Sequence, residues 1–160
     1  YLIYEKLFKA QNILALTFTN KAAKEMQSRV QNIIEDSGMP TMGTFHSVCL
    51  RILRNELTAL GYSRGFVIYD ADDQEKILKE ILQKKDIGAK FSPRLFSSYI
   101  SQAKNALQTP NELNLPLDAF ILNMVREIYT EYQNYLFEQN ALDFDDLLML
   151  TVKIFQLGDI

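Results

Sequence analysis

The sequence predicts an α/β fold in which a small parallel sheet carries an inserted all-helical block, so that the chain is mostly helical overall. Ile13 to Leu16 form an apolar run without polar alternation, which is typical of a strand buried on both faces of a parallel sheet. Short strands are also predicted at 41–44 and 66–69, and a helical pattern follows each. No strand pattern appears after Asp70, which favours a helical insertion into an α/β layer.

A polar elbow, Thr17 to Lys21, joins the first strand to a helical pattern that continues to Ile34. Thr19 or Asn20 is expected to cap this helix and leave its first N–H groups and positive dipole end facing outward. Open α/β sheets bind ligands, phosphates especially, where a strand's carboxyl end meets a helix's amino end. The elbow is therefore the expected ligand-binding site.

The remaining pattern is helical and sets the expected domain limits. A long helix is predicted from Phe45 to Gly61, because apolar residues recur there at helical spacing. Further helices are predicted at 70–82, 93–103, 120–137 and from 143 onward. The chain then divides into 1–69, an inserted helical part at 70–141, and 142–160. Residues 1–9 have the apolar spacing of a helix end, and we expect an internal fragment of a longer protein.

Composition narrows the class of protein. The 160 residues are 48% hydrophobic and 23% charged, which is ordinary for a globular domain. No apolar run approaches the ~20 residues that span a bilayer, so no membrane partner is expected. Cys49 is the only cysteine, which excludes an internal disulfide. We expect a buried structural thiol and a reducing, cytoplasmic location.

Charge is distributed unevenly along the chain. The net charge is −3. Residues 1–54 hold seven Lys/Arg and four Asp/Glu, a balance of +3, whereas residues 55–160 hold ten and sixteen, a balance of −6. A basic amino-terminal part followed by an acidic remainder is compatible with one localised phosphate-binding surface.

Three blocks carry a family resemblance. Thr17-Phe-Thr-Asn-Lys-Ala-Ala23, with Glu25-Met26, resembles motif Ia of the UvrD/Rep/PcrA-type superfamily 1 DNA helicases. Gly43-Thr-Phe-His-Ser47 is similar to their motif Ib, and Leu142-Asp-Phe-Asp-Asp-Leu147 resembles the block that precedes their Walker B motif. Order and intervals fit as well, and the resemblance covers nearly the whole chain.

The resemblance implies a partial RecA-like (P-loop NTPase) sheet with an accessory helical subdomain. It further implies an ATP- and Mg²⁺-dependent DNA helicase or translocase that moves 3′ to 5′ on single-stranded DNA towards a duplex junction, in repair or replication restart. Repair or replication proteins would be its partners. The G-x-x-x-x-G-K-[ST] and D-E-x-x motifs are absent from these residues. We therefore expect no bound cofactor, no catalytic residue and no ATP hydrolysis in the fragment alone.

The residues expected to grip DNA lie in the first two blocks: Phe18, Thr19, Asn20, Lys21, Thr44, Phe45 and His46. Phe18 is either a stacking surface for a base or a core side chain, and the resemblance favours stacking. Thr19 and Asn20 are suited to a phosphate oxygen, to plain capping or to both. Lys21 and Lys24 add charge or simply form a solvated face.

His46 is the only histidine, and nothing stands near it at metal-ligand spacing, so neither zinc nor a catalytic triad is expected. A lone histidine is usually structural, but the resemblance assigns Thr44 and His46 to DNA. Phe45 either contacts DNA or anchors its helix. Arg51 and Arg54 are placed to reach a DNA backbone or a neighbouring carboxylate.

Two charged groups remain open to more than one interpretation. Asp143, Asp145 and Asp146 stand in the first turn of a helix, where the dipole explains acids more simply than a metal does. A basic set in the helical part either faces duplex DNA or is solvated: Lys84, Lys85, Lys90, Arg94 and Lys104. Two other functions are also open, the motor of a recombination helicase–nuclease and a non-enzymatic module that binds nucleic acid or protein.

Overall fold

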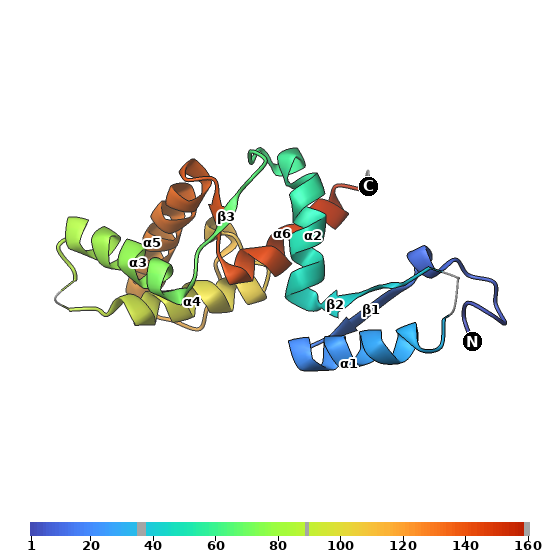
Figure 1. The fold of residues 1–160 in the computed structure, drawn as a ribbon. Helices are drawn as coiled ribbons and strands as arrows, with labels where there is room; N and C mark the ends of the chain where they lie inside the picture. The colour runs from blue at the N-terminus through green and yellow to red at the C-terminus, as the bar shows by residue number, and fades with distance from the viewer. Residues whose placement is uncertain (35–37, 89, 159–160) are drawn as a thin grey trace. The chain divides into compact units, whose positions relative to one another are not determined.

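The computed structural model describes residues 1–34, 38–88 and 90–158 and divides into two compact units, Tyr1–Arg51 (unit 1) and Ile52–Ile160 (unit 2). Strands are few and short, and helices account for most of the described chain (Figure 1). Among the described residues, no helix combines the length and apolar character that crossing a bilayer requires.

Unit 1 is a parallel βαβ arrangement. After a short 3-10 helix, η1 (Ala10–Asn12), strand β1 (Leu14–Thr17) leads into α1 (Asn20–Gln31), and β2 (Thr41–Thr44) leads directly into α2 (Phe45–Glu56). The strands pair in parallel from Leu14 opposite Thr41 to Thr17 opposite Thr44. Helix α1 packs along both strands (Figure 1). Both predicted strands are confirmed, and parallel pairing follows from the helical crossover.

Two predictions for unit 1 are wrong. Strand β1 is not buried on both faces, since Leu14 is 53% exposed and the rest of the strand is half-buried. Within unit 1 the sheet has only two strands, too few to enclose a strand. Residues 1–9 do not form the end of a helix: residues 2–6 form turns, and Leu7 has a φ of +57°, at which a right-handed helix cannot continue.

Unit 2 contains the predicted helical block. It comprises η2 (Leu57–Leu60), β3 (Val67–Ile68), α3 (Ala71–Lys84), α4 (Pro93–Asn105), η3 (Pro110–Glu112), α5 (Ala119–Glu138), β4 (Ala141–Leu142) and α6 (Phe144–Gln156). Side chains cap the four longer helices, from Asp70, Ser92, Asp118 and Asp143. Gly61 ends the second predicted helix with a φ of +86°, a conformation that favours glycine.

Strand β4 was not predicted. It pairs in parallel with β3, so that Val67 lies opposite Ala141 and Ile68 opposite Leu142. Two residues are too few to show strand periodicity, and both residues of β4 are fully buried. The helical segment between β3 and β4 thus starts and ends on neighbouring strands. The predicted limits 1–69, 70–141 and 142–160 stay a prediction.

The core of unit 2 lies where α3, α4 and α5 meet. Its fully buried members include Leu82, Ala103, Val125, Ile128 and Leu136. Each comes from the apolar stripe of its helix, and stacking these stripes removes them from water. Helix α6 packs against α4 of this core.

Candidate nucleic-acid interface

The carboxyl ends of β1 and β2 lie at one edge of the unit 1 sheet. Thr17 and Thr44, the last residues of the two strands, are register partners. Helix α1 begins three residues after Thr17, and α2 begins directly after Thr44. Two helix amino ends, each with N–H groups free of intrahelical partners, therefore meet at this edge. This is the position where parallel α/β sheets bind anionic ligands.

An exposed pair of aromatic rings lies at the same edge. Phe18 is 90% exposed and Phe45 is 38% exposed. Their ring centroids are 5.3 Å apart with the planes tilted by 38°. This exposure excludes the interpretation of Phe18 as a core residue. A ring held in this way offers a flat apolar face to water, on which a nucleic-acid base of any sequence can stack.

Thr19 is the cap of α1. Its Oγ1 accepts a hydrogen bond from the backbone N–H of Ala22 at 3.2 Å, and the Thr17 hydroxyl donates to the Thr19 carbonyl oxygen at 3.1 Å. Asn20 is the first residue of the helix and is exposed, as is Lys21. Within the part of the chain that the structure describes, Lys21 has no ion pair, so its ammonium group faces solvent. The elbow thus combines a fixed cap with an accessible amide and a cation.

Thr44 has the same role for α2 but is more deeply placed. Its Oγ1 accepts from the backbone N–H of Ser47 at 3.2 Å, and the Ser47 hydroxyl donates back to the Thr44 carbonyl oxygen at 2.9 Å. Thr44 is only 8% exposed, whereas His46, two residues on, is exposed. Of this pair, His46 therefore presents the larger surface to a ligand. Cys49, one turn further, is half-buried with a free thiol.

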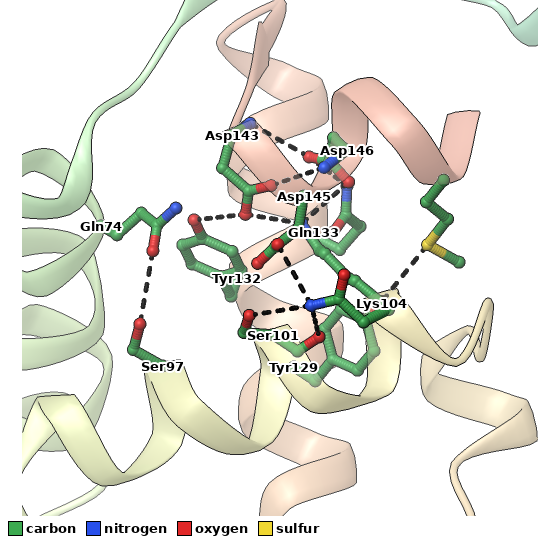
Figure 2. Close-up of polar contacts among 12 residues, drawn as sticks. Gln74, Ser97, Ser101, Lys104, Tyr129, Tyr132, Gln133, Asp143, Asp145 and Asp146 are labelled. Carbon is green, nitrogen blue, oxygen red and sulfur yellow. Dashed lines mark hydrogen bonds and ion pairs between the residues drawn. The ribbon is translucent and has the colours of Figure 1, made fainter. Parts of the chain in front are cut away.

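The acidic block at the start of α6 is a structural cluster. Asp143 caps the helix by accepting from the Asp146 N–H at 2.8 Å, and Asp146 accepts from the Asp143 N–H at 3.2 Å. Lys104 of α4 lies between the two carboxylates, 2.7 Å from Asp143 and 2.8 Å from Asp146 (Figure 2). Asp143 and Asp146 therefore have the structural role expected for them. Among the described residues no group of side chains suits a metal ion.

Two tyrosines of α5 complete this cluster (Figure 2). Tyr132 donates from its hydroxyl to Asp143 at 2.9 Å, and the Lys104 ammonium lies 5.2 Å from the Tyr132 ring and 5.9 Å from the Tyr129 ring. Burial raises the pKa of the Asp146 carboxyl. Burial alone would lower the pKa of Lys104, but the two carboxylates outweigh it and hold that pKa above its ordinary value.

One member of the basic set expected on the surface of the helical part is buried. Lys104 is fully buried, so both alternatives given for it, a duplex-facing surface and a solvated one, are wrong. Lys85 pairs with Glu131 at 2.6 Å and Glu127 at 3.4 Å, and Arg94 pairs with Glu75 at 3.1 Å. A signal for Lys104 existed in the sequence, since it follows Phe96 and Ile100 on the apolar stripe of α4. A lysine on such a stripe needs a buried acid as its partner.

The βαβ fold of unit 1 and the exposed edge at the carboxyl ends of β1 and β2 are typical of one class of protein. These are parallel α/β proteins, which commonly bind phosphate-bearing ligands at the carboxyl ends of their strands. The family model described as "UvrD/REP helicase N-terminal domain" matches residues 1–159, and the chain belongs to this family. Among known proteins, the ATP-dependent DNA helicase PcrA of Staphylococcus epidermidis is 44% identical and that of Staphylococcus aureus 43% identical, each over 158 residues. The match covers 98% of this chain and 22% of each relative's length.

Proposed function

We propose that this chain is the strand-gripping part of an ATP-dependent DNA helicase or translocase. The observation that carries the proposal is the exposed Phe18–Phe45 ring pair between two helix amino ends. Family membership supports it, because the similar PcrA proteins are named as DNA helicases. Residues 1–69 and 142–160 would then be part of a RecA-like domain, and residues 70–141 its helical accessory subdomain.

The proposed grip uses both halves of the edge. A base stacks on Phe18, which Phe45 supports from behind. Thr19, Asn20 and Lys21 bind backbone phosphate at the start of α1, and Thr44 and His46 do so at the start of α2. Stacking and phosphate contacts carry little sequence information, which suits a protein that moves along DNA of any sequence.

The described residues do not fit ATP and Mg²⁺. Neither nucleotide motif occurs in the sequence, and the carboxylates at the start of α6 are occupied by Lys104 and by backbone N–H groups. We propose that other parts of a longer protein hold the nucleotide, and that this chain alone hydrolyses none. Movement from 3′ to 5′, a role in repair or replication restart and a cytoplasmic location belong to the same proposal.

The central experiment removes the exposed ring. Phe18→Ala is expected to weaken binding of a thymidylate oligonucleotide by ~1–3 kcal/mol, or about fivefold to 150-fold, measured by fluorescence anisotropy. Phe120→Ala is the matched control, because Phe120 is also exposed, at 69%, but lies in unit 2. Equal affinities for the two variants would remove Phe18 from the grip.

A second experiment separates the motor from its alternatives. The reading frame on both sides of this chain should encode G-x-x-x-x-G-K-[ST] upstream and D-E-x-x downstream. A nuclease domain in the same frame would instead favour the recombination helicase–nuclease. A frame with neither nucleotide motif would leave a non-enzymatic binding module.

A further inference from the structure

The buried ionic cluster of unit 2 joins three helices and consists of Lys104, Tyr132, Asp143 and Asp146 (Figure 2). Lys104 of α4 lies 2.7 Å from Asp143 and 2.8 Å from Asp146, which form the capping box of α6. Tyr132 of α5 donates to Asp143 at 2.9 Å. A slide of α6 by one residue, about 1.5 Å, would break these bonds, because hydrogen bonds weaken steeply with distance and angle.

Apolar packing alone leaves the position of α6 open. The apolar core shared by α3, α4 and α5 includes Ala141 of β4 but no residue of α6. The apolar residues that α6 itself buries or half-buries lie on most sides of the helix: Leu147, Leu148, Met149, Leu150, Val152 and Ile154. A helix of this kind can be buried in several rotations with a similar loss of apolar surface, because hydrophobic burial is not directional.

Depth makes the ionic cluster a weak source of net stability. The side chains of Lys104, Asp143 and Asp146 are 0%, 2% and 1% exposed. Charges at this depth lose their solvation by water, and their mutual attraction does little more than offset that loss. Neutral groups of similar volume in place of the whole cluster are therefore often tolerated, although removal of one partner alone is costly. The directed bonds, in contrast, exist in only one position of α6.

We propose that the ionic cluster is a lock that holds the helical segment at 70–140 in one orientation against α6 and adds little to the stability of unit 2. Lys104 belongs to this segment, whereas Asp143 and Asp146 follow it, so the lock closes across the point where the chain returns through β4. Directed bonds select one arrangement among several that bury similar apolar surface. The helical segment and α6 therefore move as one body, and a displacement of the segment reaches α6.

Residual dipolar couplings of the unaltered 18.5 kDa chain test the lock by nuclear magnetic resonance. The backbone amide couplings of α3, α4, α5 and α6 are expected to fit a single alignment tensor, as those of one body do. A separate tensor for α6 would overturn the proposal, since α6 would then reorient independently of the helical segment.

A neutral variant tests whether the charges provide the lock. Lys104→Met, Asp143→Asn and Asp146→Asn together remove the charges, while the two asparagine oxygens can still accept the capping N–H groups. The variant should keep the urea midpoint of the wild type. Its α6 couplings should no longer fit the tensor of α3 to α5, and α6 amides should exchange with solvent about tenfold faster. A retained common tensor would show that apolar packing positions α6, and a variant that unfolds would show that the cluster supplies stability. Either result contradicts the lock.

Lys85 offers the matched control, because it also lies between two acids of another helix, Glu131 at 2.6 Å and Glu127 at 3.4 Å. Solvent reaches all three of these side chains. Lys85→Met combined with Glu127→Gln and Glu131→Gln is expected to leave the common tensor and the α6 exchange rates unchanged. If this control also separates α6 from the other helices, any loss of charge in unit 2 loosens α6, and the specific role of the buried cluster is refuted.

Discussion

Helices α1 and α6 begin in the same way but in different surroundings. In each, a side-chain oxygen accepts from the backbone N–H three residues on, Thr19 from Ala22 and Asp143 from Asp146. At α1 the neighbouring cation, Lys21, faces solvent. At α6 the cation is Lys104, buried against two carboxylates. One helix end is therefore open to a ligand, and the other is sealed by the protein itself.

The difference shows what fixes the role of a charged residue near a helix start. A cap satisfies the same backbone donors in both places, so capping does not separate the two roles. Burial does, because a buried charge must be paired while an exposed one is available. Changes to each site should therefore affect stability in unit 2 and binding in unit 1.

The largest effect is expected from Lys104→Ala. It leaves Asp143 and Asp146 buried without a cation, and breaking a buried pair in this way costs about 3–5 kcal/mol. The measurement is the free energy of unfolding of unit 2 from urea denaturation followed by tyrosine fluorescence. Lys84→Ala is the control, because Lys84 is exposed on α3 and should change stability by less than about 0.5 kcal/mol. An equally small change for Lys104→Ala would contradict the claim that Lys104 stabilises unit 2 by pairing with Asp143 and Asp146.

The next largest effect is expected from alkaline pH, which should lower the free energy of unfolding of unit 2. Burial, followed by the negative charge of Asp146, raises the pKa of Tyr62 from 10.0 to about 12. Since the folded state keeps this proton where the unfolded chain loses it, the stabilisation is complete below pH 10 and is lost as pH rises towards 12. The raised pKa values of Lys104, Tyr129 and Tyr132 act in the same direction.

Tyr62→Phe tests this pH dependence, because the ring and its edge contact with Phe137 remain. At about 1.4 kcal/mol per pKa unit, and allowing for solvent screening, the variant should avoid a loss of up to about 2 kcal/mol between pH 10 and 12. Stability at pH 7 is the internal reference. Parallel alkaline curves for wild type and variant would rule out a part for Tyr62.

Removal of the α1 cap should have a smaller, local effect. Thr19→Ala is expected to cost about 1 kcal/mol, because the Ala22 N–H loses its acceptor. Hydrogen exchange at the Ala22 and Ala23 amides should then be faster, with exchange in α6 unchanged. Lys21→Ala keeps the cap and should leave these rates as they are. Faster exchange in α6 as well would mean that the two helix ends are not independent.

The smallest effect is expected from Arg94→Ala, which breaks an exposed pair with Glu75. Such pairs contribute about 0–1 kcal/mol, so urea denaturation should show little change. High salt should make wild type and variant still more alike. A loss as large as that of Lys104→Ala would mean that exposure does not separate the two kinds of ion pair.

Local features of the sequence predicted much of this structure. The helix starts at Asp70, Pro93 and Asp143 could be predicted because each depends on residues within one helical turn. The short strand at 41–44 could be predicted because a helix starts directly after it. Contacts between distant residues were not predicted: the pairing of β3 with β4, and Lys104 with Asp143, 39 residues apart. Capping is encoded locally, whereas partner choice depends on packing.

The candidate site shows the same limit. The sequence placed Phe18 and Thr19 at a strand-to-helix elbow but left open whether the ring faces the core or the solvent. The orientation of the Phe18 ring depends on which elements cover the strand, and the sequence of the strand alone does not determine this.

Strands β3 and β4 also have an evolutionary consequence. Paired strands lie about 4.8 Å apart, so the chain leaves for the helical segment and returns from it at almost the same point. A segment attached in this way can vary in length far from the strands without changing their register. Its α4 cannot vary freely, because Lys104 is the buried ionic partner of Asp143 and Asp146 outside the segment.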